Sequence, residues 1–481
     1  MKKIKYILCL LVVCTSCDDF LEVEPDLQTS INEQLSTKNG VLDAYNGIYR
    51  DVEGILSSRF SVYADVQGGN ITFTPSTISK VVNVPSQIEN SYPFNDRFQE
   101  SDYADYYEEL YSIIAQVNLL LERFNEFTFF TTQERNRLEA ELLTLRAFSH
   151  YQLALHYAQH YGFTADASHL GVVYNTTVLT AGVDFPSRSS MAETYTNIQA
   201  DLNAALALFN TTQLLSGVPY SYFNEINTKA LYARIALQMN DWEQARAMAN
   251  DVIANPGITL TSQGNYISEW ENDLLPINEV ILEFTAPVSS DGTVSSSVSA
   301  NYQYTNTTNY ADYVASEDLR NLFEATDIRL NLFQEQSLTT SVNGAETQVA
   351  YYFTKKFQGN TGTLFMRLSE MYLIQAEANA RLGDTAAAFV ALNAIRTRAG
   401  IATVNDTNTL LEDIFTERRR ELAFEGFLLF DIARYQKDVE RNLGCIASAN
   451  CNLSYPSNFF ILPIPASSAE LNQNIQQNEG Y

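Results

Sequence analysis

The sequence predicts a mainly α-helical protein with a large irregular, loop-rich region. Apolar residues recur at intervals of three and four along several long segments, which is the pattern of helices with one buried face. Two of these segments resemble each other, and two other long segments show almost no helical pattern. With 481 residues, 46% of them hydrophobic, the chain can bury a large core.

The start of the chain has the pattern of a lipoprotein signal peptide. Three lysines within the first five residues precede an apolar run at 6–13, and the small residues Thr15 and Ser16 stand just before Cys17. We therefore expect residues 1–16 to be removed and Cys17 to become an acylated N-terminus that carries fatty acids such as palmitate. The alternative is an ordinary signal peptide that is cut elsewhere.

The mature chain, residues 17–481, is expected to be anchored by lipid and not to cross a membrane. The apolar run is shorter than the roughly 20 residues that span a bilayer, and no later segment is long and apolar enough. No Pro-, Gly- or Ser-rich linker and no block of charge divides the mature chain. We expect one domain, with an N-terminal part at about 17–275 and a C-terminal part at about 276–481.

The charge balance excludes some classes of partner. The full chain has a formal net charge of −27, and removal of three lysines with the signal peptide leaves a net charge of −30. Such a surface repels phosphate backbones and anionic headgroups. We therefore expect no nucleic acid partner and no basic membrane-binding patch.

The expected helices cover much of the chain. The clearest apolar stripe lies at 131–158, where Leu138, Leu142, Leu145 and Phe148 share one face of a helix that starts near Thr131. Similar stripes predict helices, in chain order, at 38–52, 103–124, 191–209, 227–253, 365–382, 385–399 and 410–434.

Two regions form a degenerate repeat with a shift of 143 positions. Each consists of a helix, a tight turn and a second helix with small alanines that permit close packing, and the matching residues are Ala233, Asp241, Ala245 and Val252 in the first region and Ala376, Asp384, Ala388 and Ile395 in the second. This is how a tetratricopeptide-like hairpin is built. The alternative is chance similarity between alanine-rich helices.

Two long segments, 66–100 and 285–316, are rich in Ser, Thr, Asn and Tyr and lack a helical pattern. Loops of this length in a compact protein are usually functional. Their aromatic residues are the candidate ligand contacts: Phe73, Tyr92 and Phe94 in the first segment, and Tyr302, Tyr304, Tyr310 and Tyr313 in the second.

Cys445 and Cys451 are the only thiols that remain after processing of the signal peptide and acylation of Cys17. An exported chain meets oxidising conditions, so we expect a local disulfide between them. A zinc site would need two further ligands, and the four histidines lie far upstream.

The segment 417–426 invites a catalytic interpretation, because Glu417, Glu421 and Glu425 recur every four residues on one helix face. A glycosidase needs one carboxyl group that stays protonated beside an ionised partner. The neighbouring arginines at 418–420 work against this, because cations keep carboxylates ionised. We therefore expect a salt-bridged structural helix and no catalytic residue.

Signals for metals and cofactors are weak. His156 and His160 are four residues apart on a predicted helix, but the zinc-hydrolase glutamate between them is missing and no third ligand is specified. The chain shows no phosphate-binding glycine loop, no nucleophile elbow and no regular calcium loop. We expect no metal and no cofactor.

Several long motifs are distributed along the chain. In the C-terminal part they are 367–378 (RLSEMYLIQAEA), 382–384 (LGD), 392–400 (LNAIRTRAG), 417–426 (ERRRELAFEG), 463–465 (PIP) with Glu470, and 477–481 (QNEGY); upstream they are 44–49 (AYNGIY), 141–151 with LRAF at 145–148, 278–281 (NEVI) and 327–329 (DIR). Together these motifs resemble those of the SusD/RagB family, and the resemblance spans the mature chain. One departure is Leu428, where the family commonly has arginine, so we expect a local salt bridge to be absent there.

The resemblance implies a non-catalytic surface lipoprotein that caps a SusC-like TonB-dependent transporter of the outer membrane and passes a nutrient to it. The nutrient is usually a glycan and in some members a peptide. The implied fold has four tetratricopeptide-like hairpins and an irregular region that carries the ligand site. Asp18 and Asp19 are similar to the acidic tag that directs lipoproteins of the Bacteroidetes to the outer face of the outer membrane.

Physical chemistry is compatible with glycan capture by loop aromatics. The C–H faces of sugars pack on aromatic rings, while their hydroxyls pair with Asn, Asp, Gln and Arg side chains. Two other classes remain open. A surface glycoside hydrolase would lose turnover when one loop carboxylate becomes an amide, and a pure protein-interaction scaffold would bind a protein partner but no small ligand.

Overall fold

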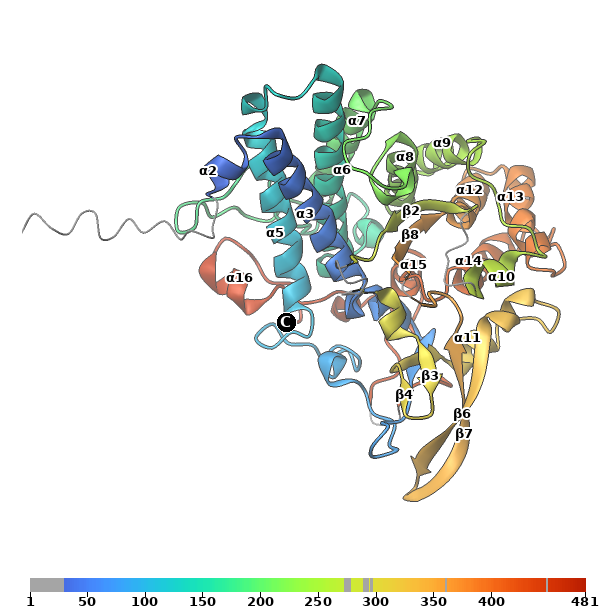
Figure 1. Cartoon of the computed structure of the whole chain (residues 1–481). Coiled ribbons are helices and arrows are strands. Elements are labelled where there is room, and N and C mark those ends of the chain that lie inside the picture. The colour runs from blue at the N-terminus through green and yellow to red at the C-terminus, as the bar shows by residue number, and fades with distance from the viewer. Residues whose placement is uncertain (1–29, 272–277, 289–293, 295–296, 360, 447–448) are drawn as a thin grey trace, which may run out of the picture.

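The computed structural model describes residues 30–481 except 272–277, 289–293, 295–296, 360 and 447–448 (Figure 1). The predicted signal peptide and Cys17 lie outside the described residues. In agreement with the predicted class, the fold is mainly α-helical. The described part of the chain contains no helix that is long and apolar enough to cross a membrane.

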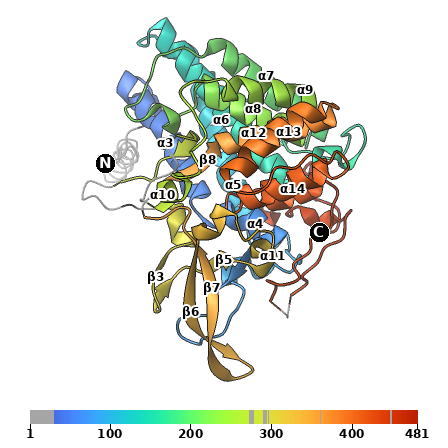
Figure 2. The ribbon, with the colours of Figure 1, turned by 90° about the vertical axis from the view of Figure 1, so that its right-hand side faces the viewer.

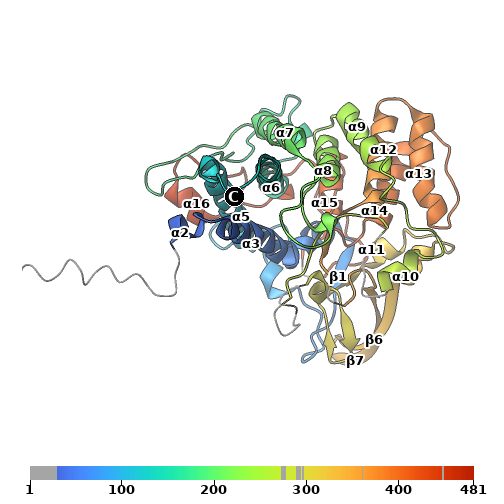
Figure 3. The same cartoon turned by 45° about the horizontal axis from the view of Figure 1, so that its top comes forward.

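Eight helices form four packed pairs that stand side by side (Figure 3). The pairs are α3 (Lys38–Leu56) with α5 (Ala104–Glu122), α6 (Thr132–Tyr157) with α7 (Met191–Leu208), α8 (Glu225–Gln238) with α9 (Trp242–Ile253), and α12 (Leu368–Arg381) with α13 (Thr385–Arg398). Each pair also contacts the next pair in the row. The four hairpins implied by the family resemblance are thus present.

The repeated residues of the third and fourth pairs have clear structural roles. Asp241 and Asp384 are the N-caps of α9 and α13, and their side chains accept hydrogen bonds from Gln244 N and Ala387 N. The preceding residues, Asn240 and Gly383, turn the chain with positive φ angles of 59° and 86°. The alanines of the repeat are fully buried, so the helices approach closely.

Caps explain where the longest helix and its partner begin. Thr131 and Glu134 form a capping box at the start of α6, and Ser190 and Glu193 form another at the start of α7. These boundaries agree with the predicted helices at 131–158 and 191–209.

Two predicted helices differ from the structure. Residues 365–367 belong to β8 (Thr363–Arg367), and α12 begins only at Leu368. The segment 410–434 is broken into α14 (Leu410–Glu421) and α15 (Leu428–Arg434), because Phe424 and Gly426 both have positive φ angles. Leu428, where we expected a salt bridge to be absent, packs closely against Gly68: a Cβ atom on Gly68 would lie 2.5 Å from Leu428 Cγ.

Within the described part of the chain, all four sheets are two-stranded and antiparallel. β1 (Ile71–Phe73) pairs with β5 (Tyr313–Ala315), β2 (Val280–Phe284) with β8, β3 (Tyr304–Asn306) with β4 (Asn309–Tyr310), and β6 (Phe333–Val342) with β7 (Ala345–Thr354). The loop-rich segments 66–100 and 285–316 therefore contain short strands. Figure 2 shows the long β6–β7 hairpin projecting from the body of the molecule beside β3.

The remaining described elements are short. They are the α-helices α2 (Ile31–Gln34), α4 (Tyr63–Gly68), α10 (Tyr266–Glu271), α11 (Glu317–Arg320) and α16 (Ala466–Leu471), and the 3-10 helices η2 (Arg59–Val62), η3 (Ser86–Ile88), η4 (Phe124–Glu126), η5 (Tyr161–Phe163), η6 (Pro219–Ser221), η7 (Val298–Asn301), η8 (Ile328–Leu332) and η9 (Asn458–Phe460).

Candidate functional site

Four of the seven candidate aromatic residues lie in the core. Phe73 and Tyr313 are opposite each other in the β1–β5 pair, and Tyr92 packs on Phe73 with ring centroids 5.0 Å apart. Tyr302 is enclosed between Phe357 and Phe424. None of the four is more than 6% exposed. A ligand cannot contact these rings in this conformation, so the predicted set narrows to Phe94, Tyr304 and Tyr310.

Tyr304 and Tyr310 form a cross-strand pair. They are directly opposite each other on β3 and β4, so both rings lie on the same face of the hairpin. Each packs on Phe353 of β7, at centroid distances of 5.1 and 6.2 Å, and each remains partly exposed. The hydroxyl of Tyr310 donates to the carbonyl of Pro75 at 2.8 Å, which holds this ring in place.

We call the pair of rings of Tyr304 and Tyr310 the Tyr304–Tyr310 platform. Polar groups lie beside it. The hairpin turn exposes Asn306, Thr307, Thr308 and Asn309. Asn306 Oδ1 accepts from the backbone N and the hydroxyl of Thr308, at 2.9 and 2.8 Å, so the turn is ordered by its own side chains. Two aromatic faces beside amide and hydroxyl groups can stack a sugar ring and pair with its hydroxyls.

Phe94 occupies a separate place. The centre of its ring lies 4.6 Å from the guanidinium carbon of Arg441, and the centre of the Tyr92 ring lies 4.2 Å from the same atom. Arg441 is buried, and its Nε donates to the carbonyl of Cys451 at 2.9 Å. Cys445 and Cys451 are joined in a disulfide. The loop closed by this disulfide therefore supports the position of Phe94.

The carboxylates of Glu417, Glu421 and Glu425 are enclosed in ion pairs. Glu417 and Glu421 lie on α14, but Glu425 follows the end of this helix, so the three carboxylates do not share one helix face as the sequence predicted. Glu417 and Glu421 are fully buried, and the side chain of Glu425 is 4% exposed. Their charged partners are Arg329, Arg396 and Arg420 for Glu417, Arg329, Arg367 and Arg398 for Glu421, and Lys356 and Arg367 for Glu425.

This arrangement is unsuited to acid catalysis. Burial alone would raise the pKa of Glu421, but Arg398, Arg367 and Arg329 outweigh it and hold the pKa well below the usual range. Burial opposes ionisation of Glu425 too, yet Arg367 and Lys356 lower its pKa. Neither carboxyl group can therefore keep a proton to donate to a leaving group at neutral pH.

The two histidines face different partners. His156 Nδ1 lies 2.8 Å from the carbonyl of Gln152, whereas His160 Nε2 lies 2.9 Å from the hydroxyl of Tyr455. Burial lowers the pKa of each histidine to about 4. Among the residues that the structure describes, no group of three or more His, Cys, Asp or Glu side chains could hold a metal ion.

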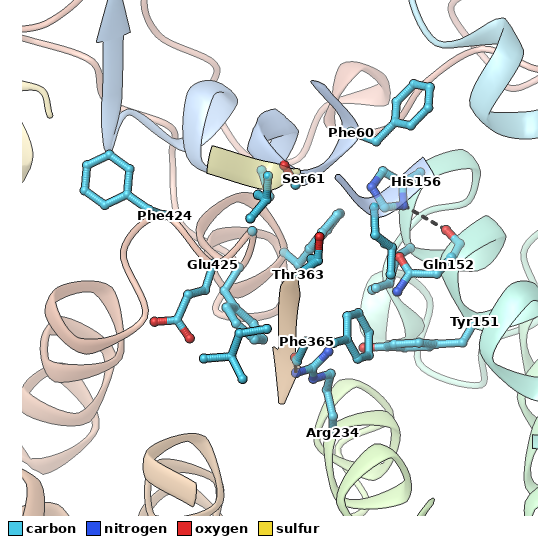
Figure 4. Close-up of a pocket in the computed structure, with 18 of the residues that line it drawn as sticks. Phe60, Ser61, Tyr151, Gln152, His156, Arg234, Thr363, Phe365, Phe424 and Glu425 are labelled. Atoms are coloured by element: carbon cyan, nitrogen blue, oxygen red, sulfur yellow. Dashed lines mark hydrogen bonds between the residues drawn. The ribbon is translucent and has the colours of Figure 1, made fainter. Parts of the chain in front are cut away.

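A central cavity lies between the helices and β8 (Figure 4). Its lining includes Tyr151, His156, Arg234, Phe365 and Phe424, from segments far apart in sequence. The volume is about 70 Å³. Ligand pockets usually measure about 300–1,000 Å³, so this cavity has room for water molecules but not for a sugar ring.

Two family models match different parts of the chain. One, described as the SusD family, matches residues 330–481, and the other, described as starch-binding associating with outer membrane, matches residues 19–237. The SusD-like protein P38 of Formosa agariphila is 24% identical over 518 aligned positions, which cover 92% of this chain and 93% of that relative.

Solved structures show the same fold. A SusD superfamily protein from Bacteroides thetaiotaomicron VPI-5482 superposes with a TM-score of 0.80 at 25% identity, covering 92% of this chain and 99% of that chain. A SusD-like carbohydrate binding protein from Bacteroides vulgatus ATCC 8482 superposes with a TM-score of 0.74 at 21% identity, covering 91% of this chain and 97% of that chain.

Proposed function

The chain belongs to the SusD/RagB family, and on this premise we propose that the protein is a non-catalytic nutrient-binding protein of the cell surface. It captures an oligosaccharide or polysaccharide and passes it to a SusC-like TonB-dependent transporter. Acyl groups on Cys17 hold it at the outer membrane, facing the cell exterior. The match of residues 19–237 to a model described as starch-binding and associated with the outer membrane supports both the ligand class and the location.

The Tyr304–Tyr310 platform carries the proposal. A sugar ring needs an aromatic face together with hydrogen-bonding groups, and both rings have a fixed orientation because Phe353 supports them from below. Two other candidates fit a ligand site less well: the central cavity is too small, and the carboxylates of Glu421 and Glu425 are buried and paired.

A binding measurement tests the platform directly. We expect the purified protein to bind a member of a panel of neutral oligosaccharides, starting with maltooligosaccharides, in isothermal titration calorimetry. Tyr304→Ala and Tyr310→Ala should each weaken binding by about tenfold or more. Tyr220→Ala is the matched control, because Tyr220 is also partly exposed but lies on η6.

The outcomes separate the competing functions. Absence of binding to every glycan, or an equal loss with Tyr220→Ala, would overturn the glycan platform. A panel of peptides in the same calorimeter tests the peptide-binding alternative. Co-purification of a barrel protein with the lipid-anchored form tests the transporter partnership. If no barrel protein co-purifies, the proposed transfer of the ligand to a transporter is contradicted.

A further inference from the structure

A large concavity lies away from the Tyr304–Tyr310 platform. It has a volume of about 610 Å³ and lies between α5, the segment 173–186 and the segment 467–475, and we call it the α5–α16 groove. Figure 1 places α5 and α16 at the left and the β3–β4 hairpin at the lower right. The two surfaces are therefore separate sites.

The walls of this groove are tied together by hydrogen bonds. Asn118 Nδ2 on α5 donates to the carbonyls of Asn175 and Thr177, each at 3.1 Å. Glu122 accepts from Val178 N at 2.7 Å, which fixes the same segment further along α5. On the opposite wall, Asn472 Nδ2 donates to the carbonyl of Pro186 at 2.8 Å. These hydrogen bonds fix the walls of the groove relative to one another.

Apolar side chains form part of the lining of the groove and lie around it, among polar residues. Tyr107, Tyr111 and Ile114 line it from α5. Large apolar side chains gather around it with much of their surface exposed, namely Val178 (37%), Leu179 (39%), Val183 (69%), Phe185 (44%) and Leu471 (78%). Exposed apolar patches with a polar rim mark interaction surfaces. Val183 is not a lining residue, so a small molecule inside the groove would leave it uncovered, whereas a partner that extends beyond the groove could bury it.

Three polar side chains of the groove are already engaged. Glu108 accepts from the hydroxyl of Ser467 at 2.5 Å, and Asp184 accepts from Thr180 N at 2.7 Å. Asn118 uses its amide nitrogen for the wall and its oxygen to accept from Arg146. A sugar would find these three side chains already paired, whereas an apolar occupant would bury the exposed apolar side chains, so the groove favours an apolar occupant.

The charge of the groove indicates which charge the occupant should carry beside its apolar side chains. Its lining includes the carboxylates of Glu108 and Asp184 and contains no lysine, arginine or histidine. The whole chain has a formal net charge of −27, so an acidic partner would be repelled. Basic side chains on either side of an apolar anchor would complement this surface.

We propose that the α5–α16 groove docks a segment of a partner protein that inserts apolar side chains and carries lysine or arginine beside them. This contact is independent of saccharide capture, because the groove and the Tyr304–Tyr310 platform share no lining residue. The protein would then hold a ligand and a partner at the same time.

Synthetic peptides test the chemistry. The probes are a short amphipathic peptide of Leu and Lys, the same peptide with Glu in place of Lys, and the same peptide with Ser in place of Leu, titrated by fluorescence anisotropy at physiological salt. We expect the Leu/Lys peptide to bind at least about tenfold more tightly than either of the others. Equal binding of the Ser/Lys peptide would show that the acidic surface attracts any cation, and it would overturn the proposal.

Variants locate the binding site. Phe185→Ser combined with Leu471→Ser should weaken binding of the Leu/Lys peptide by about tenfold or more, and the exposure of both residues should preserve the fold. Ile78→Ser combined with Val390→Ser is the matched control, because these residues are 91% and 73% exposed at other places. Equal affinity of the two double variants would refute the groove as the docking site. Saccharide titration of the groove variant should match the unmodified protein, so a failed platform and a failed groove give different results.

Discussion

The guanidinium of Arg234 faces the carboxylate of Glu370 edge to edge, with Nε 2.6 Å from Oε1 and Nη2 2.7 Å from Oε2. Arg234 belongs to α8 and Glu370 to α12, so the pair joins the third and fourth helix pairs. The rings of Phe365 and Phe427 lie 4.3 and 4.8 Å from the guanidinium carbon and shield it from solvent. This two-pronged contact therefore holds neighbouring hairpins in register inside the core.

We expect Glu370→Ala to destabilise the protein by about 3–5 kcal/mol, because it leaves the buried charge of Arg234 without a partner. The measurement is urea unfolding followed by circular dichroism. Glu412→Ala is the control, since it breaks an exposed pair with Lys437 and should change the free energy of unfolding by no more than about 1 kcal/mol. Similar losses in both variants would contradict the expected role of the Arg234–Glu370 pair.

Because of Asp65, the free energy of unfolding should decrease as pH rises from about 4 to about 6. It is fully buried on α4, where it accepts from Gly426 N at 2.7 Å, and burial raises its pKa to about 6. Between about pH 4 and pH 6 the folded state keeps a proton that the unfolded state has already released. The free energy of unfolding therefore decreases across this window, by about 3 kcal/mol for a pKa raised from 3.8 to about 6.

Comparison with Asp65→Asn isolates this contribution. The variant has no titrating group at this position, so its free energy of unfolding should depend less steeply on pH between about pH 4 and pH 7. Asp96, whose pKa burial also raises to about 6, titrates in both proteins and cancels in the comparison. Identical pH dependence of the two proteins in urea unfolding would disprove the assignment to Asp65.

The helical scaffold was predictable because its signals are local. The Thr131–Glu134 capping box and the matching residues Asp241 and Asp384 specify helix starts within a few residues of sequence. The break in the helix after Glu421 was not predictable, because the apolar stripe continues through a segment in which Phe424 adopts a positive φ. The β6–β7 hairpin had an available signal, the turn Asn343-Gly344 between two strand-like runs, which helical periodicity alone overlooks.

The site was harder to predict because burial of a loop aromatic depends on distant partners. Phe73 is covered by Tyr313, which is more than 200 positions away in sequence, and Tyr302 is covered by Phe424. Tyr304 and Tyr310 have the same local composition as the buried tyrosines. Only the β3–β4 pairing and the contact with Phe353 distinguish them, and neither can be read from sequence order.

We expect no hydrolysis of any saccharide that the protein binds. Glu417, Glu421 and Glu425 are buried and paired with cations, and the lowered pKa values of Glu421 and Glu425 keep these two carboxyl groups ionised at neutral pH. A reducing-end assay over long incubation should match a protein-free control. Glu421→Gln should lower stability by about 3 kcal/mol or more, because Arg367 and Arg398 lose a shared partner. Turnover that disappears in a folded Glu421→Gln variant would establish the hydrolase alternative.

Arg441 should be energetically coupled to the disulfide. Its guanidinium donates to the carbonyls of Tyr92, Asn450 and Cys451 and is stacked between the rings of Tyr92 and Phe94. Arg441→Met removes these hydrogen bonds and should lower the free energy of unfolding by about 1.5–3 kcal/mol.

In a protein that also carries Cys445→Ser and Cys451→Ser, the loop no longer holds the carbonyls of residues 450 and 451 in place. The same substitution should then cost about 1 kcal/mol less, a coupling that a double-mutant cycle of urea unfolding measures. Additive losses would show that the disulfide-closed loop and Arg441 stabilise the protein independently, so that reducing agents would leave the position of Phe94 unchanged.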